Sequence, residues 1–181
     1  MARCRPPRLA MIAIVVGLGL SAMPAVTAAQ DGQIQCNVTE NGAPSNGTVA
    51  VEHNGRTVAS GSCNRALSVP AGKSKVTLRL EGLLDNPAQT IEVVVAAGKT
   101  TPVTADFKTA LLEVRIEAKG QRGTGLVAVE KDGKRLGTLG SGVAARLSAG
   151  AYEVVVKLGG QEQRHAVDLR PGQRRVVRAQ F

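Results

Sequence analysis

Aromatic residues are nearly absent from this 181-residue sequence, which has no tryptophan, one tyrosine and two phenylalanines. A hydrophobic core must therefore be built from Val, Leu, Ile and Ala, with Phe107 and Phe181 as its largest side chains. Proteins that hold single-stranded nucleic acid stack its bases on aromatic rings. The shortage of such rings argues against a nucleic-acid partner.

Motifs that carry catalysis are missing as well: there is no Gly-rich phosphate loop, no His-Glu metal motif and no nucleophile elbow. His53 precedes an Asn-Gly turn and is expected at the surface. His165 and Asp168 are three residues apart, which places them on opposite faces of a strand and excludes a metal pair or dyad. Glu52 and Glu130 are expected in solvent or in ion pairs. We predict no catalytic residue, metal site or cofactor, and no enzyme activity.

Long apolar runs are absent too. Residues 9–22 form an apolar run of fourteen, short of the ~20 residues that cross a bilayer. Three arginines precede it, and the small residues Thr27-Ala28-Ala29 follow it, as in a cleaved export signal. We expect residues 1–29 to be a signal peptide, the mature chain to have no transmembrane span, and the protein to be periplasmic or secreted. An uncleaved anchor is the alternative.

Cysteine is scarce, with three in the chain, and Cys4 would leave with the signal peptide. Cys36 and Cys63 then remain, and an even pair in an exported chain predicts one disulfide. It would close a loop of roughly 25 residues and contribute on the order of 3 kcal/mol. Because the pair lacks the CxxC spacing, we expect a structural rather than a redox role.

An internal repeat is the strongest positive feature. VAVEHNG at Val49–Gly55 returns as VAVEKDG at Val127–Gly133, an offset of 78 residues. With this offset, thirteen of the forty-nine positions from Ile34 to Gly82 are identical without a gap. Beyond Gly82 the offset falls to 74, so four residues are deleted from one loop of the second copy. The chain is therefore predicted to be a duplication of a small domain, with module 1 at residues 30–109 and module 2 at residues 110–181.

Apolar and polar residues alternate with a period of two in both modules, which predicts strands with one buried face. Asn54-Gly55 and Asp132-Gly133 supply the positive φ of type I′ hairpin turns. The predicted fold is all-β, with two tandem antiparallel β-sandwich domains of the Ig-like or prealbumin-like kind. Only Lys108 to Leu111 join them, without Gly, Pro or Ser, so we expect an elongated molecule with restricted hinge motion.

Module 2 contains the stretch LSAGAYEVVV followed by RPGQ. Tyr152 in this stretch is expected to return its hydroxyl to nearby backbone, as a tyrosine does at a sandwich corner. Leu147, Ala149-Gly150 and Tyr152 resemble the pattern of bacterial PEGA domains and carboxypeptidase-regulatory-like domains, and module 1 matches it less fully. The resemblance implies a non-catalytic, exported accessory or interaction module, and it identifies no functional residue.

Charge is divided unevenly between the modules. Module 1 has seven basic and seven acidic residues, whereas module 2 has thirteen and seven, a net charge of +6. Alternation along the last hairpin places four arginines on the face away from the core and a fifth near the turn: Arg164, Arg170, Arg174, Arg178 and, at the turn, Arg175. Such a cluster can attract lipopolysaccharide, a cell-wall polymer or an acidic protein. The alternative is a solvated face that protects an edge strand.

Three functions are consistent with these features. The first is an interaction or structural module of the bacterial envelope, whose partner is an envelope protein or an anionic cell-surface polymer. The second is a binder of anionic envelope glycan or lipid through the basic C-terminal hairpin. The third is a protease inhibitor that presents the loop from Leu83 to Gln89, which contains the four extra residues of module 1.

Overall fold

The structure, a computed structural model, describes residues 30–181, so the signal peptide predicted for residues 1–29 lies outside the described part. The described chain consists of strands and turns and contains no helix, hence none that could cross a membrane. Module 1 contains β1 (Asp31–Glu40), β2 (Ala43–Pro44), β3 (Gly47–His53), β4 (Arg56–Ser62), β5 (Leu67–Pro70), β6 (Gly72–Leu80), β7 (Ala88–Val95) and β8 (Thr100–Phe107). The first strand of module 2 begins at Thr109, so from here on Thr109 is counted with module 2. Module 2 contains β9 (Thr109–Ala118), β10 (Gln121–Gly123), β11 (Leu126–Lys131), β12 (Lys134–Leu139), β13 (Ala144–Ser148), β14 (Gly150–Leu158), β15 (Gln161–Leu169) and β16 (Arg174–Gln180).

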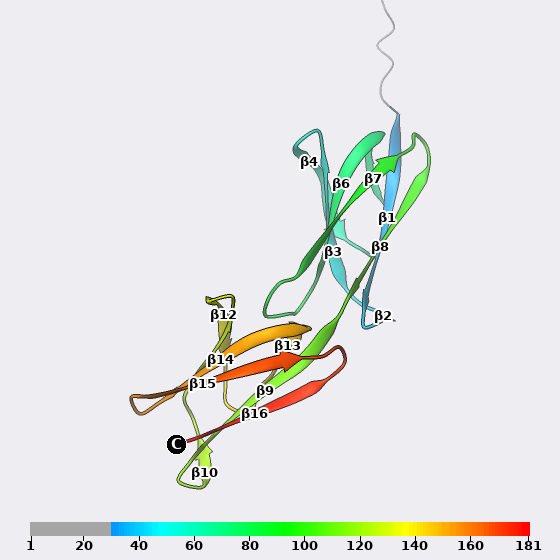
Figure 1. Cartoon of the computed structure of the whole chain (residues 1–181). Helices are drawn as coiled ribbons and strands as arrows, with labels where there is room; N and C mark the ends of the chain where they lie inside the picture. Colours follow the sequence, from blue (N-terminus) through cyan, green and yellow to red (C-terminus); the bar gives the residue numbers. More distant parts are fainter. Residues whose placement is uncertain (1–29) are drawn as a thin grey trace, which may run out of the picture.

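Each module is a pair of sheets packed face to face (Figure 1). In module 1, β1 pairs with β2, β5 and β8, and the second sheet has the order β4-β3-β6-β7. In module 2, β9 pairs with β10, β13 and β16, and the second sheet has the order β12-β11-β14-β15. The predicted all-β fold of two tandem sandwiches is therefore confirmed.

The duplication extends to the strand register. Val51 pairs with Val76 in module 1, and Val129 pairs with Val154 in module 2, which preserves the offset of 78. A β-bulge follows both Val51 and Val129. The loop deletion is also visible in the pairing. Val76 pairs with Ile91 and Val154 pairs with His165, so beyond the loop the equivalent residues follow the offset of 74. The two modules are thus copies at the level of backbone pairing.

One feature differs from the antiparallel expectation. The first and last strands of each module, β1 with β8 and β9 with β16, run parallel. As a consequence β15 and β16 are not a hydrogen-bonded hairpin, because the chain crosses from one sheet to the other between them.

Each module has its own hydrophobic core. Aliphatic side chains from the inner faces fill each one, with Leu78, Leu80 and Ile34 in module 1 and Leu112, Ile116 and Leu147 in module 2 almost fully buried. Phe107 is buried in the first core and Phe181 packs against the second, as expected. The predicted hairpin turns are also present, since both residues of Asn54-Gly55 and of Asp132-Gly133 have positive φ.

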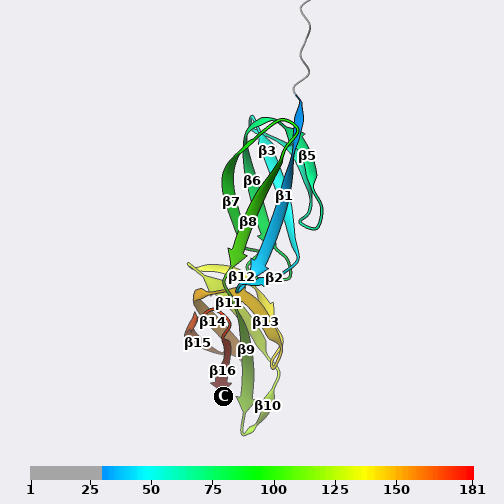
Figure 2. The same cartoon turned by 90° about the vertical axis from the view of Figure 1, so that its right-hand side faces the viewer.

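The modules lie end to end, and the described chain starts and finishes at opposite ends of the rod (Figure 2). Lys108 alone separates β8 from β9. Asn41 of module 1 bridges this join, because its Nδ2 donates to the Thr109 carbonyl oxygen at 3.1 Å and its Oδ1 accepts from the Thr109 N–H at 3.0 Å. The Glu40 carboxylate binds the Arg146 guanidinium and the Thr109 hydroxyl.

The loop that is longer in module 1 completes the junction. Leu84 donates its N–H to the Arg146 carbonyl oxygen at 2.9 Å, and its side chain packs against the module 2 core beside Gly137. A Cβ on Gly137 would lie 2.5 Å from a Leu84 methyl carbon, so any larger residue would force the leucine side chain to move. Asp85 accepts from the Ser148 N–H and from the Tyr152 hydroxyl. The loop from Leu83 to Gln89 is therefore docked, which removes the basis for a freely presented inhibitory loop.

Candidate functional site: an arginine-rich sheet face

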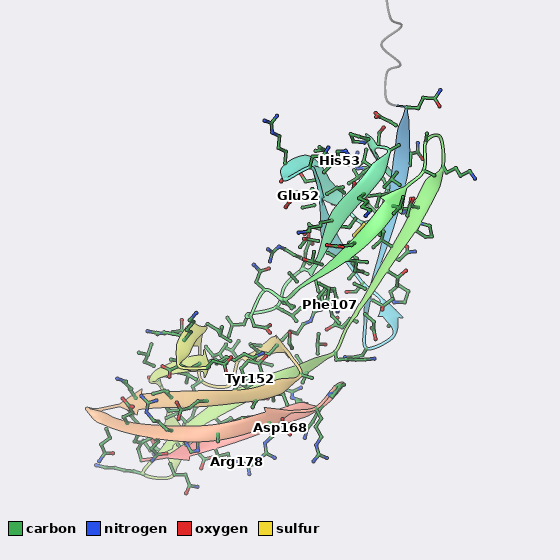
Figure 3. The ribbon with its side chains drawn as sticks, turned by 45° about the horizontal axis from the view of Figure 1, so that its top comes forward. Glu52, His53, Phe107, Tyr152, Asp168 and Arg178 are labelled. Atoms are coloured by element: carbon green, nitrogen blue, oxygen red, sulfur yellow. A yellow bond between two sulfur atoms is a disulfide. The ribbon has the colours of Figure 1, made fainter. Side chains whose placement is uncertain are left out.

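The outer face of the sheet formed by β9 and β16 carries three arginines, Arg115, Arg174 and Arg178. Alternation buries Leu112, Val114 and Ile116 of β9 and Val177 and Ala179 of β16. The intervening residues then point outward: Glu113, Arg115 and Glu117 on β9, and Arg174, Val176, Arg178 and Gln180 on β16. Figure 3 shows Arg178 on the lower module, far from Glu52 and His53 at the other end of the rod.

Glu113 lies at the centre of this face and is only 3% exposed, because two arginines cover it. Its Oε1 accepts from Arg115 Nε at 2.6 Å, and its Oε2 accepts from Arg174 Nη2 at 2.6 Å. Hydrogen bonds first from Arg174 and then from Arg115 lower the pKa of Glu113 below its usual value. The carboxylate therefore stays ionised and fixes two guanidinium groups, and the three side chains together carry one net positive charge.

Arg178 adds a second positive charge at short range. In the parallel register it lies directly opposite Arg115. Among residues 30–181, Arg178 has no carboxylate partner, whereas Arg115 and Arg174 share one. Like charges that face each other across a strand pair are destabilising. An anion placed between Arg115 and Arg178 would relieve this repulsion.

The arginines predicted from the sequence do not all share this face. Arg174 and Arg178 do, but Arg164 belongs to β15 of the other sheet, where it contacts Glu130, Glu153 and Glu162. The hydrogen bonds that Arg164 donates to Glu162 and Glu153 raise its pKa above the usual value. The placement on one hairpin face was wrong because it assumed that β15 and β16 pair, and each pairs with a different sheet.

Arg170 and Arg175 flank the face rather than form it. Arg170 lies in the turn before β16, and its N–H donates to Gln173 Oε1 at 3.2 Å. Arg175 is in phase with the buried Val177 but is exposed at the start of the strand.

Arg115 was missed by sequence reasoning. Alternation with Val114 and Ile116 is the signal that would have predicted an outward side chain, but its neighbour Arg178 follows only from the parallel pairing of β9 with β16.

The remaining predicted residues have structural surroundings. Cys36 and Cys63 form the predicted disulfide, with 5.0 Å between their Cα atoms. His53 Nδ1 lies 3.1 Å from the Ser74 hydroxyl, so it is part of a polar contact rather than freely solvated. Glu52 is exposed, and Glu130 lies 3.6 Å from Arg164, as expected for an outward or ion-paired glutamate.

His165 faces inward and Asp168 outward, as expected for residues three apart on a strand. The Nε2 of His165 is buried without a hydrogen-bond partner in the described part of the chain. No cluster of three or more His, Cys, Asp or Glu side chains in residues 30–181 is arranged to hold a metal.

Tyr152 forms the predicted corner. Its hydroxyl donates to the Ser148 carbonyl oxygen at 2.9 Å, and it also lies 3.1 Å from Asp85 Oδ2 of module 1. Burial, with the nearby Asp85 charge as a smaller cause, raises the pKa of Tyr152 well above its usual value. The tyrosine is therefore a structural donor that also joins the modules, and no pattern in the sequence predicts this second contact.

No protein-family model and no curated protein sequence matches this chain. Among solved structures, the Bacillus anthracis TIE protein aligns with 84% of the chain at 12% identity and a TM-score of 0.39, and the chain spans about a third of its length (34%). A candidate adhesin from Bacteroides ovatus aligns over 92% of this chain and 98% of its own at 11% identity and a TM-score of 0.40.

A candidate polysaccharide-binding protein from Bacteroides thetaiotaomicron aligns over 77% of this chain and 80% of its own, at 8% identity and a TM-score of 0.42. Similarity at this level says nothing about what the chain binds. The resemblance to PEGA and carboxypeptidase-regulatory-like domains stays a prediction.

Proposed function

We propose that the chain is an exported, non-catalytic interaction or structural module of the bacterial envelope. The observation that carries this proposal is the junction, in which Glu40, Asn41 and Asp85 of module 1 bind backbone and side chains of module 2. Such contacts hold two sandwiches in one orientation, as a spacer or a display scaffold requires. A disulfide such as Cys36–Cys63 persists in oxidising compartments, which supports export.

The test is the location and redox state of the whole chain in a bacterial host. A C-terminally tagged full-length protein is fractionated after alkylation of free thiols, and envelope partners are captured by mild cross-linking. We expect recovery in the periplasmic or secreted fraction, with Cys36 and Cys63 protected from alkylation. A chain that stays in the cytoplasm with both thiols alkylated would contradict the proposal.

A second function is favoured by the arginine pair: binding of an anionic envelope glycan or lipid. Arg115 and Arg178 face each other, and Arg174 extends the positive charge along β16. Guanidinium groups bind phosphate and carboxylate in bidentate fashion. Because Glu113 already holds Arg115 and Arg174 in place, little side-chain entropy remains to be lost when an anion binds.

The corresponding test compares two charge-matched variants of residues 30–181. One replaces Arg115, Arg174 and Arg178 by the module 1 residues at those positions, Asn, Thr and Thr, and the control replaces Arg56, Arg65 and Arg79 of module 1 by Ser. Binding to phosphatidylglycerol vesicles and to lipopolysaccharide is measured at low and high salt. We expect at least a tenfold loss for the first variant alone, about 1.4 kcal/mol. Equal losses would reveal a net-charge effect and overturn this function.

A further inference from the structure

The strand β7 (Ala88–Val95) is a free edge. It ends the sheet β4-β3-β6-β7 of module 1, and its ladder partner is β6. Figure 2 places it along the margin of the upper module. Its outward N–H and C=O groups meet no other strand among residues 30–181. A strand edge of this kind is a template for another strand.

The outer side chains of β7 favour such pairing. Alternation with the buried Val95 points Thr90, Glu92 and Val94 outward. Val94 is 68% exposed, which makes it the most exposed large hydrophobic residue in the described chain. Glu92 is the only charged residue of the strand.

The equivalent edge of module 2 is protected. β15 occupies the same position in its sheet, but Arg164 replaces Thr90 and Asp168 replaces Val94. Arg164 is held there by Glu153 and Glu162. Charged side chains on an edge oppose strand addition. The β7 edge of module 1, with Glu92 as its one charge, is therefore the less protected of the two equivalent edges.

We propose that β7 pairs antiparallel with β7 of a second copy of this chain, joining two four-stranded sheets across a two-fold axis. In such a pair, the inward side chains of one strand must lie opposite inward side chains of the other. This holds only if the two-fold axis passes through a residue position of β7 and not between two positions. An axis at Glu92 would oppose two carboxylates, which is unfavourable. An axis at Val93 sets Glu92 opposite the second copy's Val94 and Ile91 opposite its Val95. That register keeps the two Glu92 carboxylates apart and sets the inward-facing Val93 and Ile91 against valines of the second copy.

This pairing is independent of the arginine face, which lies on module 2. A single strand pair belongs to the smallest class of interfaces, below about 1,200 Å². We expect a reversible dimer that forms at concentrations on the order of 100 µM.

Sedimentation equilibrium of residues 30–181 from about 10 µM to 1 mM tests the dimer. Val94→Asp gives β7 the residue of β15 and is expected to weaken association at least tenfold. Val143→Asp is the matched control, because Val143 is 56% exposed in a turn outside any strand. Circular dichroism checks that both variants remain folded. A chain that is monomeric throughout this range, or a Val94→Asp variant that dimerises like the parent, would overturn the proposal.

Cross-linking tests the register separately. Glu92→Cys and Val94→Cys are made as single variants, and their outward side chains keep the new thiols away from the Cys36–Cys63 disulfide in the core. A mixture of the two is expected to form a disulfide-linked heterodimer under mild oxidation, at least fivefold faster than either variant alone. Faster cross-linking of Glu92→Cys with itself would exclude the Val93 axis.

Discussion

The two modules use one backbone to present two different surfaces. On the sheet that contains the first and last strands, module 1 exposes amides and hydroxyls, namely Gln33, Asn37, Thr100 and Thr104. At the equivalent positions module 2 has Leu111, Arg115, Arg174 and Arg178. The inner positions remain aliphatic in both. The buried half of each strand is therefore apolar in both modules, whereas the solvent-facing half differs in charge.

The modules also differ in how their sheets are cross-connected. Cys36 of β1 is bonded to Cys63, which follows β4 in the other sheet. At the position of Cys63, module 2 has Ser141, whose hydroxyl accepts the Ile116 N–H at 3.1 Å. A hydrogen bond thus takes the place of a covalent bond. Exchanging or removing these features should affect one module more than the other.

The largest expected effect comes from giving module 1 the residues of module 2, Cys36→Val with Cys63→Ser. The cysteines are 27 positions apart, and loss of this loop constraint should lower the free energy of unfolding of module 1 by about 3 to 4 kcal/mol. Hydrogen exchange in urea, resolved by module, measures the effect. Module 2 should keep its protection, and an equal loss in both modules would show that they unfold as a unit.

The next largest effect concerns the junction. Asp85→Ala leaves the Ser148 N–H without its acceptor, at a cost of about 1 to 2 kcal/mol, and removes one of two acceptors from Tyr152. We expect module 2 to lose stability and small-angle scattering to reveal a wider spread of interdomain angles. A double-mutant cycle with Tyr152→Phe isolates the coupling. Unchanged scattering would mean that Leu84 and Asn41 suffice to fix the orientation.

Acid should weaken module 1 through Asp106. A hydrogen bond from Lys108, followed by those from Gly42 and Thr39, lowers the pKa of Asp106 to about 2, from 3.8. Because the folded-state pKa is the lower one, the carboxylate stabilises the fold above about pH 4, and this contribution is lost between pH 4 and 2. Asp106→Asn should flatten the acid dependence of module 1 in that window. Module 2 has Gln180 at this position and should respond only through its own carboxylates, such as Glu113.

The smallest effect is expected from Arg178→Thr, which restores the module 1 residue opposite Arg115. Removal of like charges facing each other should raise the stability of module 2 by a few tenths of a kcal/mol at low salt and by less at high salt. Thermal unfolding at two ionic strengths measures this difference. A clear loss of stability would indicate that the Arg178 side chain contributes packing to the sheet.

Local signals in the sequence predicted local features. Alternation gave the strands, Asn54-Gly55 and Asp132-Gly133 gave the turns, and the cysteine count gave the disulfide. The errors came from long-range pairing. β9 and β16 are hydrogen-bonded neighbours although they are the first and last strands of their module. No short-range sequence pattern predicts a parallel partner so distant in the chain. For the same reason Arg115 was overlooked and Arg164 was grouped with the wrong strand.

The contacts at the junction also set a limit on how such modules can be chained. The lower end of module 2 has Ala118 and Lys119 where module 1 has Glu40 and Asn41, and a tight Gly159-Gly160 turn where module 1 has the docking loop. A further domain of the same kind placed below module 2 would find neither the acidic anchor nor the leucine wedge. The ion pair and the buried leucine that set the angle between these two modules are therefore features of the lower end of module 1 alone, and the lower end of module 2 is built without them.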